Sequence, residues 1–200
     1  MRNWIHAGDA RVLMTVSAHD VADEFRRRDN SIGRAKLHKL LYYAQGWHLV
    51  LADEPMFPER IEAWANGPVV AELWADERYE RPRPAPRPLN ELQLATIDYV
   101  VSRYGRFSGV ALIRQTHLED PWREASETDD AWSTANPELT FDALRQWFEQ
   151  DDDYRSHVAD VERLRARTDV YSFASTPRTP ELDAAVGRAS RGERVCHTRP

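Results

Sequence analysis

The sequence predicts a mainly α-helical, compact, multi-helix single domain with a short extended or β-hairpin insert near residues 55–64. Apolar residues recur at three- and four-residue steps in several segments, which is the spacing of one face of an α-helix. Ser, Asn or Thr precedes several of these segments, as is typical of helix N-caps. Strand-like patterning is confined to a few residues between prolines and a turn signal. Helical segments therefore dominate the predicted fold.

The first predicted helix begins after Ser17 and ends near Arg28. Ser17 and Asp20 have the spacing of a capping box, in which each side chain bonds the backbone of the other residue. Residues 1–16 precede this helix as an N-terminal extension. Met14 is an alternative start of the chain, because the domain begins shortly after it.

The segment from Ala35 to Leu51 is predicted to be a helix buried in the centre of the domain, because it is apolar over most of its circumference. Its residues at helical spacing are Leu37, Leu40, Leu41, Ala44, Trp47, His48 and Leu51. Gly46 lies inside this helix and costs about 1 kcal/mol relative to alanine. We therefore expect another element to pack closely against Gly46.

A short extended region follows the central helix. Pro55 and Pro58 restrict the chain to extended or turn conformations. Ile61–Trp64 is predicted to be a short strand or an extended edge segment. The sequence Asn66-Gly67-Pro68 predicts a turn that leads directly into a helix, with Pro68 at the first helical position.

The second half of the chain is predicted to hold three more helices of the domain. Residues 81–88 read RPRPAPRP, which predicts an extended, exposed linker. Asn90, Ser108 and Thr140 are the predicted N-caps of the three helices. The helix after Ser108 is predicted to end before Pro121, because a proline disfavours helical geometry at the preceding residue.

The predicted domain spans residues 17–150. Residues 151–169 are predicted to form a charged C-terminal helix. Residues 170–200 are rich in Pro, Ser, Thr and Arg, and this polar composition predicts a disordered tail.

Composition limits the classes of function. The 200 residues are 42% hydrophobic, which is enough for the core of one domain, and the net charge is −6. This charge disfavours a dedicated nucleic-acid-binding protein, for which a basic surface is expected. The run Arg26-Arg27-Arg28 spreads around a helix, and is interpreted as a solvated face.

The sequence indicates a cytoplasmic protein with no membrane association. Cys196 is the single cysteine, so an internal disulfide is excluded, and this is typical of a reducing compartment. No apolar run approaches the roughly 20 residues of a membrane-spanning helix.

The sequence offers no local pattern of a catalytic, metal or cofactor site. His38 and His48 are separated by roughly 15 Å along one helix, so they cannot ligate one zinc ion. No glycine-rich phosphate loop occurs, and Ser108 is better interpreted as an N-cap than as a nucleophile. We therefore expect no enzyme activity, no metal and no cofactor.

Three motifs in order carry a resemblance to a known family. KLHKLLYYAQGWHLVL begins at Lys36, IEAWANGPVV begins at Ile61, and THLEDPW begins at Thr116. Together they resemble the core of the Panacea, or SocA-like, antitoxin domain family over residues 17 to about 150. The family-motif residues, which we expect to define the fold, are Lys36, Leu37, Lys39, Leu40, Leu41, Tyr42, Tyr43, Ala44, Gln45, Trp47, Ile61, Glu62, Ala63, Trp64, Gly67, Pro68, Val69, Val70, Thr116, His117, Pro121 and Trp122.

The resemblance implies an antitoxin of a type II toxin–antitoxin system, bacterial or phage-associated, that neutralises a co-encoded protein toxin by direct binding. Two alternatives stand beside it. One is a nucleic-acid-binding transcriptional regulator, in which Arg26-Arg27-Arg28 and the linker arginines would contact phosphates. The other is a hydrolase that uses His117 and Asp120.

Five aromatic or imidazole side chains are candidates for contacting the protein partner, because aromatic anchors dominate many interfaces. They are Tyr42, Trp64, Trp74, His117 and Trp122. We expect Tyr42 and Trp74 to be exposed. Trp64 and Trp122 are more readily interpreted as core residues, and His117 as a residue that hydrogen-bonds a helix end.

Overall fold

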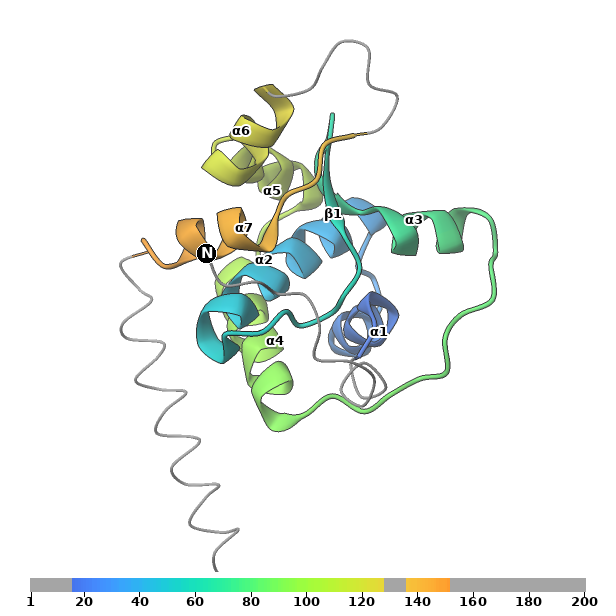
Figure 1. Ribbon diagram of the computed structural model, residues 1–200. Helices are drawn as coiled ribbons and strands as arrows, with labels where there is room; N and C mark the ends of the chain where they lie inside the picture. Colours follow the sequence, from blue (N-terminus) through green and yellow to red (C-terminus); the bar gives the residue numbers. More distant parts are fainter. Residues whose placement is uncertain (1–15, 128–135, 152–200) are drawn as a thin grey trace, which may run out of the picture. The chain divides into compact units, whose positions relative to one another are not determined.

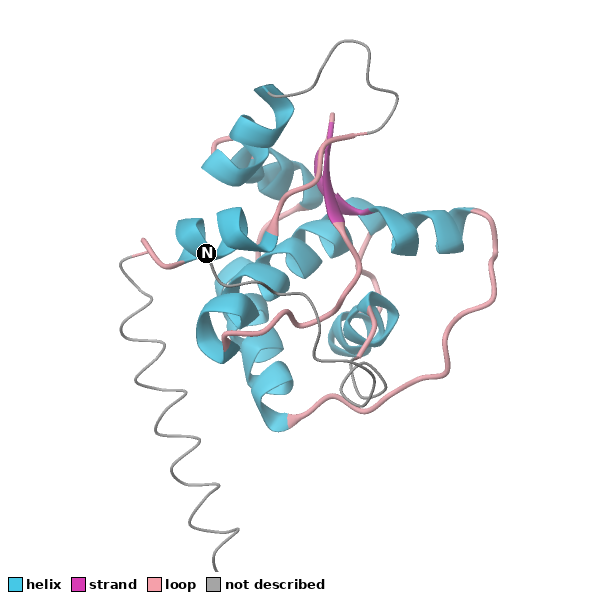
Figure 2. Cartoon of the chain, in the orientation of Figure 1, coloured by secondary structure: helices cyan, strands magenta, loops and turns pink. Residues whose placement is uncertain are grey.

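The computed structural model describes residues 16–127 and 136–151, all of which lie in one compact unit, Met1–Val161. Within these residues the chain forms seven helices and one two-stranded antiparallel sheet (Figures 1 and 2). The elements are α1 (Ala18–Arg28), α2 (Arg34–Ala52), β1 (Ile61–Trp64), β2 (Gly67–Val70), α3 (Ala71–Arg78), α4 (Glu91–Tyr104), α5 (Gly109–Thr116), α6 (Asp120–Glu127) and α7 (Phe141–Phe148). The predicted mainly α fold with a small hairpin is confirmed.

Helix α2 runs through the middle of the unit. Helices α1, α4, α5 and α7 and strand β2 all pack against it (Figure 1). Every residue from Leu37 to Leu49 is buried, including residues on all sides of the helix. The prediction of a central buried helix is confirmed, and α2 is the scaffold on which the other elements are placed.

Gly46 is a point of close approach between α2 and α7. A Cβ atom added at Gly46 would overlap the ring of Phe148. That ring also lies within 5.3–6.1 Å, between ring centroids, of the aromatic rings of Tyr42, Tyr43 and Trp47. The expected close packing at Gly46 is therefore confirmed, and the element responsible is α7.

The hairpin lies at residues 61–70, so its second strand is later in the chain than the predicted insert at 55–64. Ile61 pairs with Val70 and Ala63 pairs with Pro68. The predicted helix start at Pro68 is wrong, since Pro68 lies in β2 and α3 begins at Ala71. The strand tolerates proline because Ala63 N–H donates to Pro137 O at 2.8 Å, on the other edge of β1. Ala63 and Pro68 therefore form a non-hydrogen-bonded pair of the antiparallel sheet, and β1 needs no backbone donor from Pro68.

Residues 53–60 are attached to α2 by one side chain. Gln45 Oε1 accepts hydrogen bonds from the backbone N–H groups of Met56, at 3.0 Å, and Phe57, at 3.2 Å. Gln45 Nε2 donates to Phe57 O at 3.1 Å. Met56 and Phe57 are fully buried. The extended segment between α2 and β1 is therefore part of the core.

The predicted helix starts are confirmed at four capping residues. Ser17 and Asn90 form complete capping boxes, and Ser108 and Thr140 each accept a hydrogen bond from the backbone N–H three residues later. Helix α6 was not predicted. The extended linker at 81–88 is confirmed as exposed and without regular structure.

The predicted C-terminal helix at 151–169 and the tail at 170–200 lie outside the described residues, apart from Asp151. The same holds for residues 1–15 of the predicted N-terminal extension. Among the described helices, none is long and apolar enough to cross a membrane.

Candidate partner-binding site

Three aromatic side chains form a contiguous cluster beside the hairpin. The rings of Trp64 and Trp74 meet edge to face at 5.0 Å between centroids, and Trp74 meets Tyr79 in the same way at 6.3 Å. Trp64 and Trp74 are half-buried, whereas Tyr79 is 63% exposed. Trp74 is thus less exposed than predicted. Tyr79 was missed, because its position at the C-terminal end of α3 gives no periodic signal.

His117 and Trp122 form a second aromatic pair on the other side of β1. Their rings stack at 3.9 Å between centroids with an interplanar angle of 18°. Trp122 Nε1 donates to the backbone oxygen of Trp64 at 3.0 Å, which ties the start of α6 to the hairpin. Both residues of the pair are half-buried. Burial and the nearby Lys39 ammonium lower the pKa of His117.

His117 was expected to hydrogen-bond a helix end through its ring, but the bond that the structure shows comes from its backbone. The backbone N–H of His117 donates to Ile113 O and closes α5. The ring nitrogen Nε2 is buried and has no hydrogen-bond partner among the described residues.

Tyr42 was predicted to be exposed, and this prediction is wrong. Its side chain is fully buried, and its hydroxyl donates to Glu119 Oε2 at 2.7 Å. The cause is the position of α2, which is covered by other elements on all sides. Tyr42 is therefore a core residue and is not accessible to a partner.

Glu119 is a buried carboxylate that was not among the predicted site residues. It accepts one hydrogen bond from Tyr42 and one from Tyr43, the latter at 2.8 Å. Burial raises the pKa of Glu119 to about 7, against the opposing effect of these hydrogen bonds. Glu119 lies next to a cavity of about 360 Å³, whose rim holds the ion pair of Arg103 and Asp151 at 2.8 Å. The only signal in the sequence was its place inside the THLEDPW motif.

A second cavity, of about 380 Å³, lies between the start of α2, the hairpin turn and α3. We call it the tryptophan pocket. Its lining includes Arg34, His38, Lys39, Trp64, Asn66 and Trp74. Two indole rings and Val69 make much of its wall apolar, and no acidic side chain of the described residues lines it.

His38, which lines the tryptophan pocket, carries an unused hydrogen-bond donor. Its side chain is buried, and burial together with the charges of Lys39 and Arg34 lowers its pKa to about 3, so the ring is neutral at pH 7. Nδ1 accepts from the backbone N–H of Val70 at 3.3 Å. The ring proton therefore resides on Nε2, which is buried and has no partner among the residues that the structure describes.

Lys39 places a buried cation beside the same pocket. The side chain is 1% exposed, and Nζ donates to Pro68 O at 2.9 Å. No carboxylate lies within ion-pair distance of it in the described part of the chain. Burial lowers the pKa of Lys39 to about 8. A buried lysine is usually paired, so this one leaves the region of the pocket electropositive.

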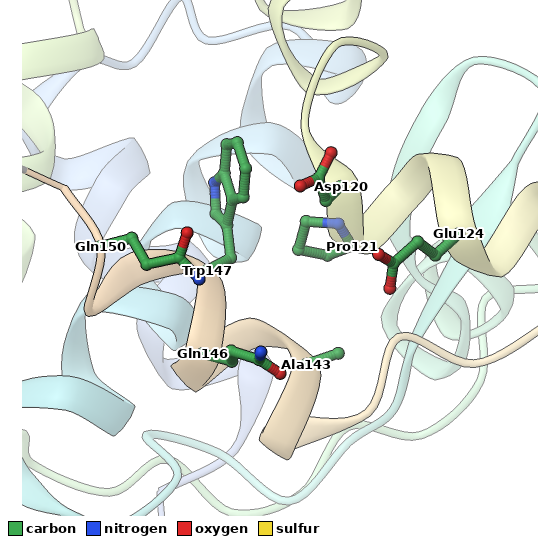
Figure 3. A pocket seen from close by; sticks show the side chains of 7 residues that line it. All are labelled: Asp120, Pro121, Glu124, Ala143, Gln146, Trp147 and Gln150. Atoms are coloured by element: carbon green, nitrogen blue, oxygen red, sulfur yellow. The ribbon is translucent and has the colours of Figure 1, made fainter.

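The residues of the hydrolase alternative do not form a catalytic pair. The carboxylate of Asp120 binds Arg123 at 2.9 Å, and no hydrogen bond joins it to His117. Asp120 instead lines a small pocket between α6 and α7, opposite Gln146 and Trp147 (Figure 3). Within residues 16–127 and 136–151, no group of three His, Cys, Asp or Glu side chains is placed to hold a metal ion.

The arginine run of α1 is engaged within the protein. Arg26 forms an ion pair with Glu77, Arg27 pairs with Glu24, and Arg28 pairs with both Glu24 and Asp98. The run was interpreted as a solvated face, and the structure adds that its charges are balanced by carboxylates. It offers few free guanidinium groups for a phosphate backbone.

Residues 37–123 match the model of the family described as "Antitoxin SocA-like, Panacea domain". The matched segment covers nearly all of α2, the hairpin, α3 to α5 and the start of α6, and it includes most of the tryptophan pocket. The resemblance seen in the three motifs is therefore confirmed. No curated protein and no solved structure matches the chain.

Proposed function

We propose that this chain is the antitoxin of a type II toxin–antitoxin system and neutralises a co-encoded protein toxin by direct binding. The observation that carries the proposal is the match of residues 37–123 to the family described as SocA-like antitoxins. In this proposal the protein acts in the cytoplasm as a binding module, without catalysis and without a cofactor.

The proposed contact surface consists of Trp64, Trp74 and Tyr79 around the mouth of the tryptophan pocket. Half-buried and exposed aromatic rings next to a cavity have the character of interface hot spots, which bury large areas at little cost in conformational entropy. The rings are fixed by edge-to-face contacts, so the surface is largely preformed. Trp122 supports this surface from behind, through its hydrogen bond to Trp64 O.

The two alternatives find less support. A transcriptional regulator would need free basic residues, but the arginines of α1 are paired with carboxylates and the net charge is −6. A hydrolase would need a nucleophile and a base in contact, but the ring of His117 is stacked on Trp122.

Co-expression with the neighbouring open reading frame tests the proposal. The neighbour is induced alone and then with this protein, while growth and co-purification through one affinity tag are measured. We expect toxicity that the full-length chain relieves, together with a stable complex. A harmless neighbour, or one that does not co-purify, would contradict the proposal.

The Trp74→Ala variant tests the contact surface. Removal of one interface hot spot lowers affinity by about 30-fold or more, so we expect rescue of growth to weaken strongly. Trp147→Ala on α7 is the matched control, since Trp147 is also a half-buried tryptophan but lies outside the proposed surface. Equal losses for both variants would indicate damage to the fold and not to an interface.

A further inference from the structure

We propose that the tryptophan pocket receives an aspartate or glutamate side chain of the protein partner. The carboxylate accepts a hydrogen bond from His38 Nε2 and faces Arg34, while the apolar part of the same residue packs against the adjoining rings of Trp64 and Trp74. This inference rests on the proposed function, because it names the chemistry that the partner presents at this surface.

The buried His38 ring has a hydrogen-bond donor that is not used within the described part of the protein. His38 is 2% exposed, its Nδ1 is occupied by the N–H of Val70, and its Nε2–H has no acceptor among the described residues. A buried donor without an acceptor costs about 1–3 kcal/mol in the unbound protein. An acceptor delivered by a partner into the pocket that this ring lines would remove that cost.

The lining of the tryptophan pocket carries two basic side chains. Arg34 is exposed and forms no ion pair with any described residue, and Lys39 is buried without a carboxylate. The arginines of α1, in contrast, are all paired with acidic residues. Among the described residues, the pocket lining thus holds the basic side chains of Arg34 and Lys39 and no carboxylate, while Glu62, outside the lining, accepts a hydrogen bond from Trp64 Nε1 at 2.8 Å. Such a site is complementary to an anion from the partner.

The donors and the apolar walls of the pocket suit a carboxylate better than a phosphate. His38 and Arg34 both line the pocket and each carries a donor without a partner among the described residues, which suits the two oxygens of one carboxylate, since Lys39 Nζ already donates to Pro68 O. The apolar indole walls suit the carbon atoms that an acidic side chain carries, and a cavity of about 380 Å³ has room for them. A phosphate dianion, which has more oxygens to satisfy, would leave several without donors here.

The inference is tested first on the full-length chain alone, by titration with sodium propionate. The readout is the ¹⁵N chemical shift of the His38 ring. We expect saturable binding in the millimolar range, with a shift at Nε2, and no binding of the neutral isostere propionamide. Equal binding of propionamide, tighter binding of inorganic phosphate, or no binding of propionate would overturn the inference.

The second test uses the complex with the toxin. His38→Asn keeps an acceptor for the N–H of Val70 but removes the Nε2 donor, and Arg34→Gln removes an exposed charge. We expect His38→Asn to weaken toxin binding by about 10-fold or more and Arg34→Gln by about 5-fold. Arg114→Gln is the matched control on α5, and it should leave affinity unchanged, because Arg114 is exposed and outside the pocket lining.

The outcomes separate this inference from the proposed function. Rescue by the wild-type chain, with unchanged affinity in both pocket variants, would refute the acidic anchor and leave the antitoxin proposal intact. Failure of the wild-type chain to rescue would refute the antitoxin proposal, while the propionate titration would still decide the chemistry of the pocket. Thermal melting checks the fold of His38→Asn, and if that variant unfolds, Arg34→Gln decides.

Discussion

At the scale of single residues, Glu119 shows how burial sets a protonation state. Two tyrosine hydroxyls donate to its carboxylate, which favours the charged form, yet burial outweighs them and raises its pKa to about 7. The folded protein therefore holds a proton on Glu119 between pH 4.5 and 7, where the unfolded chain releases it. The stabilisation from this proton is complete below pH 4.5 and is lost as the pH rises through 7.

We predict that the unfolding free energy of the wild-type protein falls relative to that of Glu119→Gln as pH rises from 5 to 8. A shift from 4.5 to about 7 corresponds to at most about 3 kcal/mol. The comparison with a variant is needed because His38, whose pKa is lowered, acts in the opposite direction between pH 3 and 6.5. Urea denaturation across this range measures the difference.

Glu124→Gln is the control for this prediction, since Glu124 is an exposed carboxylate on α6. Its unfolding free energy should track that of the wild-type protein at every pH. A constant difference between the wild-type protein and Glu119→Gln from pH 5 to 8 would contradict the raised pKa.

Tyr42 and His38 show which features of single residues the sequence pattern could not predict. Tyr42 was expected at the surface as a candidate for contacting the partner. The partner that satisfies this hydroxyl, Glu119, is 77 residues away and has no periodic relation to it. The unused Nε2 of His38 was equally hidden, because it depends on the distance to Val70 on another element.

At the scale of elements, the helices were predictable and the hairpin only in part. Capping residues and apolar periodicity are local signals, so α1, α2, α4, α5 and α7 could be read directly. The start of strand β2 was mistaken for a helix start. The sequence does not show that Ala63, the residue of β1 that pairs with Pro68, bonds Pro137 and therefore needs no hydrogen bond from Pro68. Helix α6 was missed because Pro121 was taken only as a stop, although proline is well tolerated in a first helical turn.

At the scale of elements, the side chain of Gln45 bonds the backbone of the segment between α2 and β1, as a neighbouring strand would do. Gln45→Leu would leave three backbone groups of Met56 and Phe57 unpaired inside the core. We predict a loss of unfolding free energy of about 3–5 kcal/mol. Amide hydrogen exchange should accelerate first at Met56 and Phe57.

Gln93→Leu is the matched control for Gln45→Leu. Gln93 belongs to the capping box of α4 with Asn90, so its loss should cost only about 1 kcal/mol. Equal losses in the two variants, or unchanged protection of Met56 and Phe57 in Gln45→Leu, would show that Gln45 does not hold the segment.

At the scale of the whole molecule, the contact between Gly46 and Phe148 joins the central helix α2 to α7, the last described helix. We predict that Gly46→Ala lowers the unfolding free energy by about 1–3 kcal/mol, because the Phe148 ring must move. Phe148→Leu should also destabilise the protein. The double variant should be less destabilised than the sum of the two, since the smaller side chain leaves room for the methyl group.

Gly33→Ala provides the control for this cycle, because a Cβ at Gly33 meets no atom within 4 Å. Its effect should stay below about 1 kcal/mol, as expected for a change at a helix N-cap. Denaturant unfolding of the four proteins measures the coupling. Additive losses would mean that α7 does not pack on Gly46.

The same contact has a consequence for the newly made chain on the ribosome. Gly46 and Phe148 are 102 residues apart in the sequence, so α7 is made long after the helix that it covers. At a synthesis rate of about 5–20 residues per second, this delay is about 5–20 s. During that interval the apolar side of α2 that α7 covers has no partner, and it is a natural substrate for a chaperone. The packing around α2 is therefore complete only after translation has passed α7.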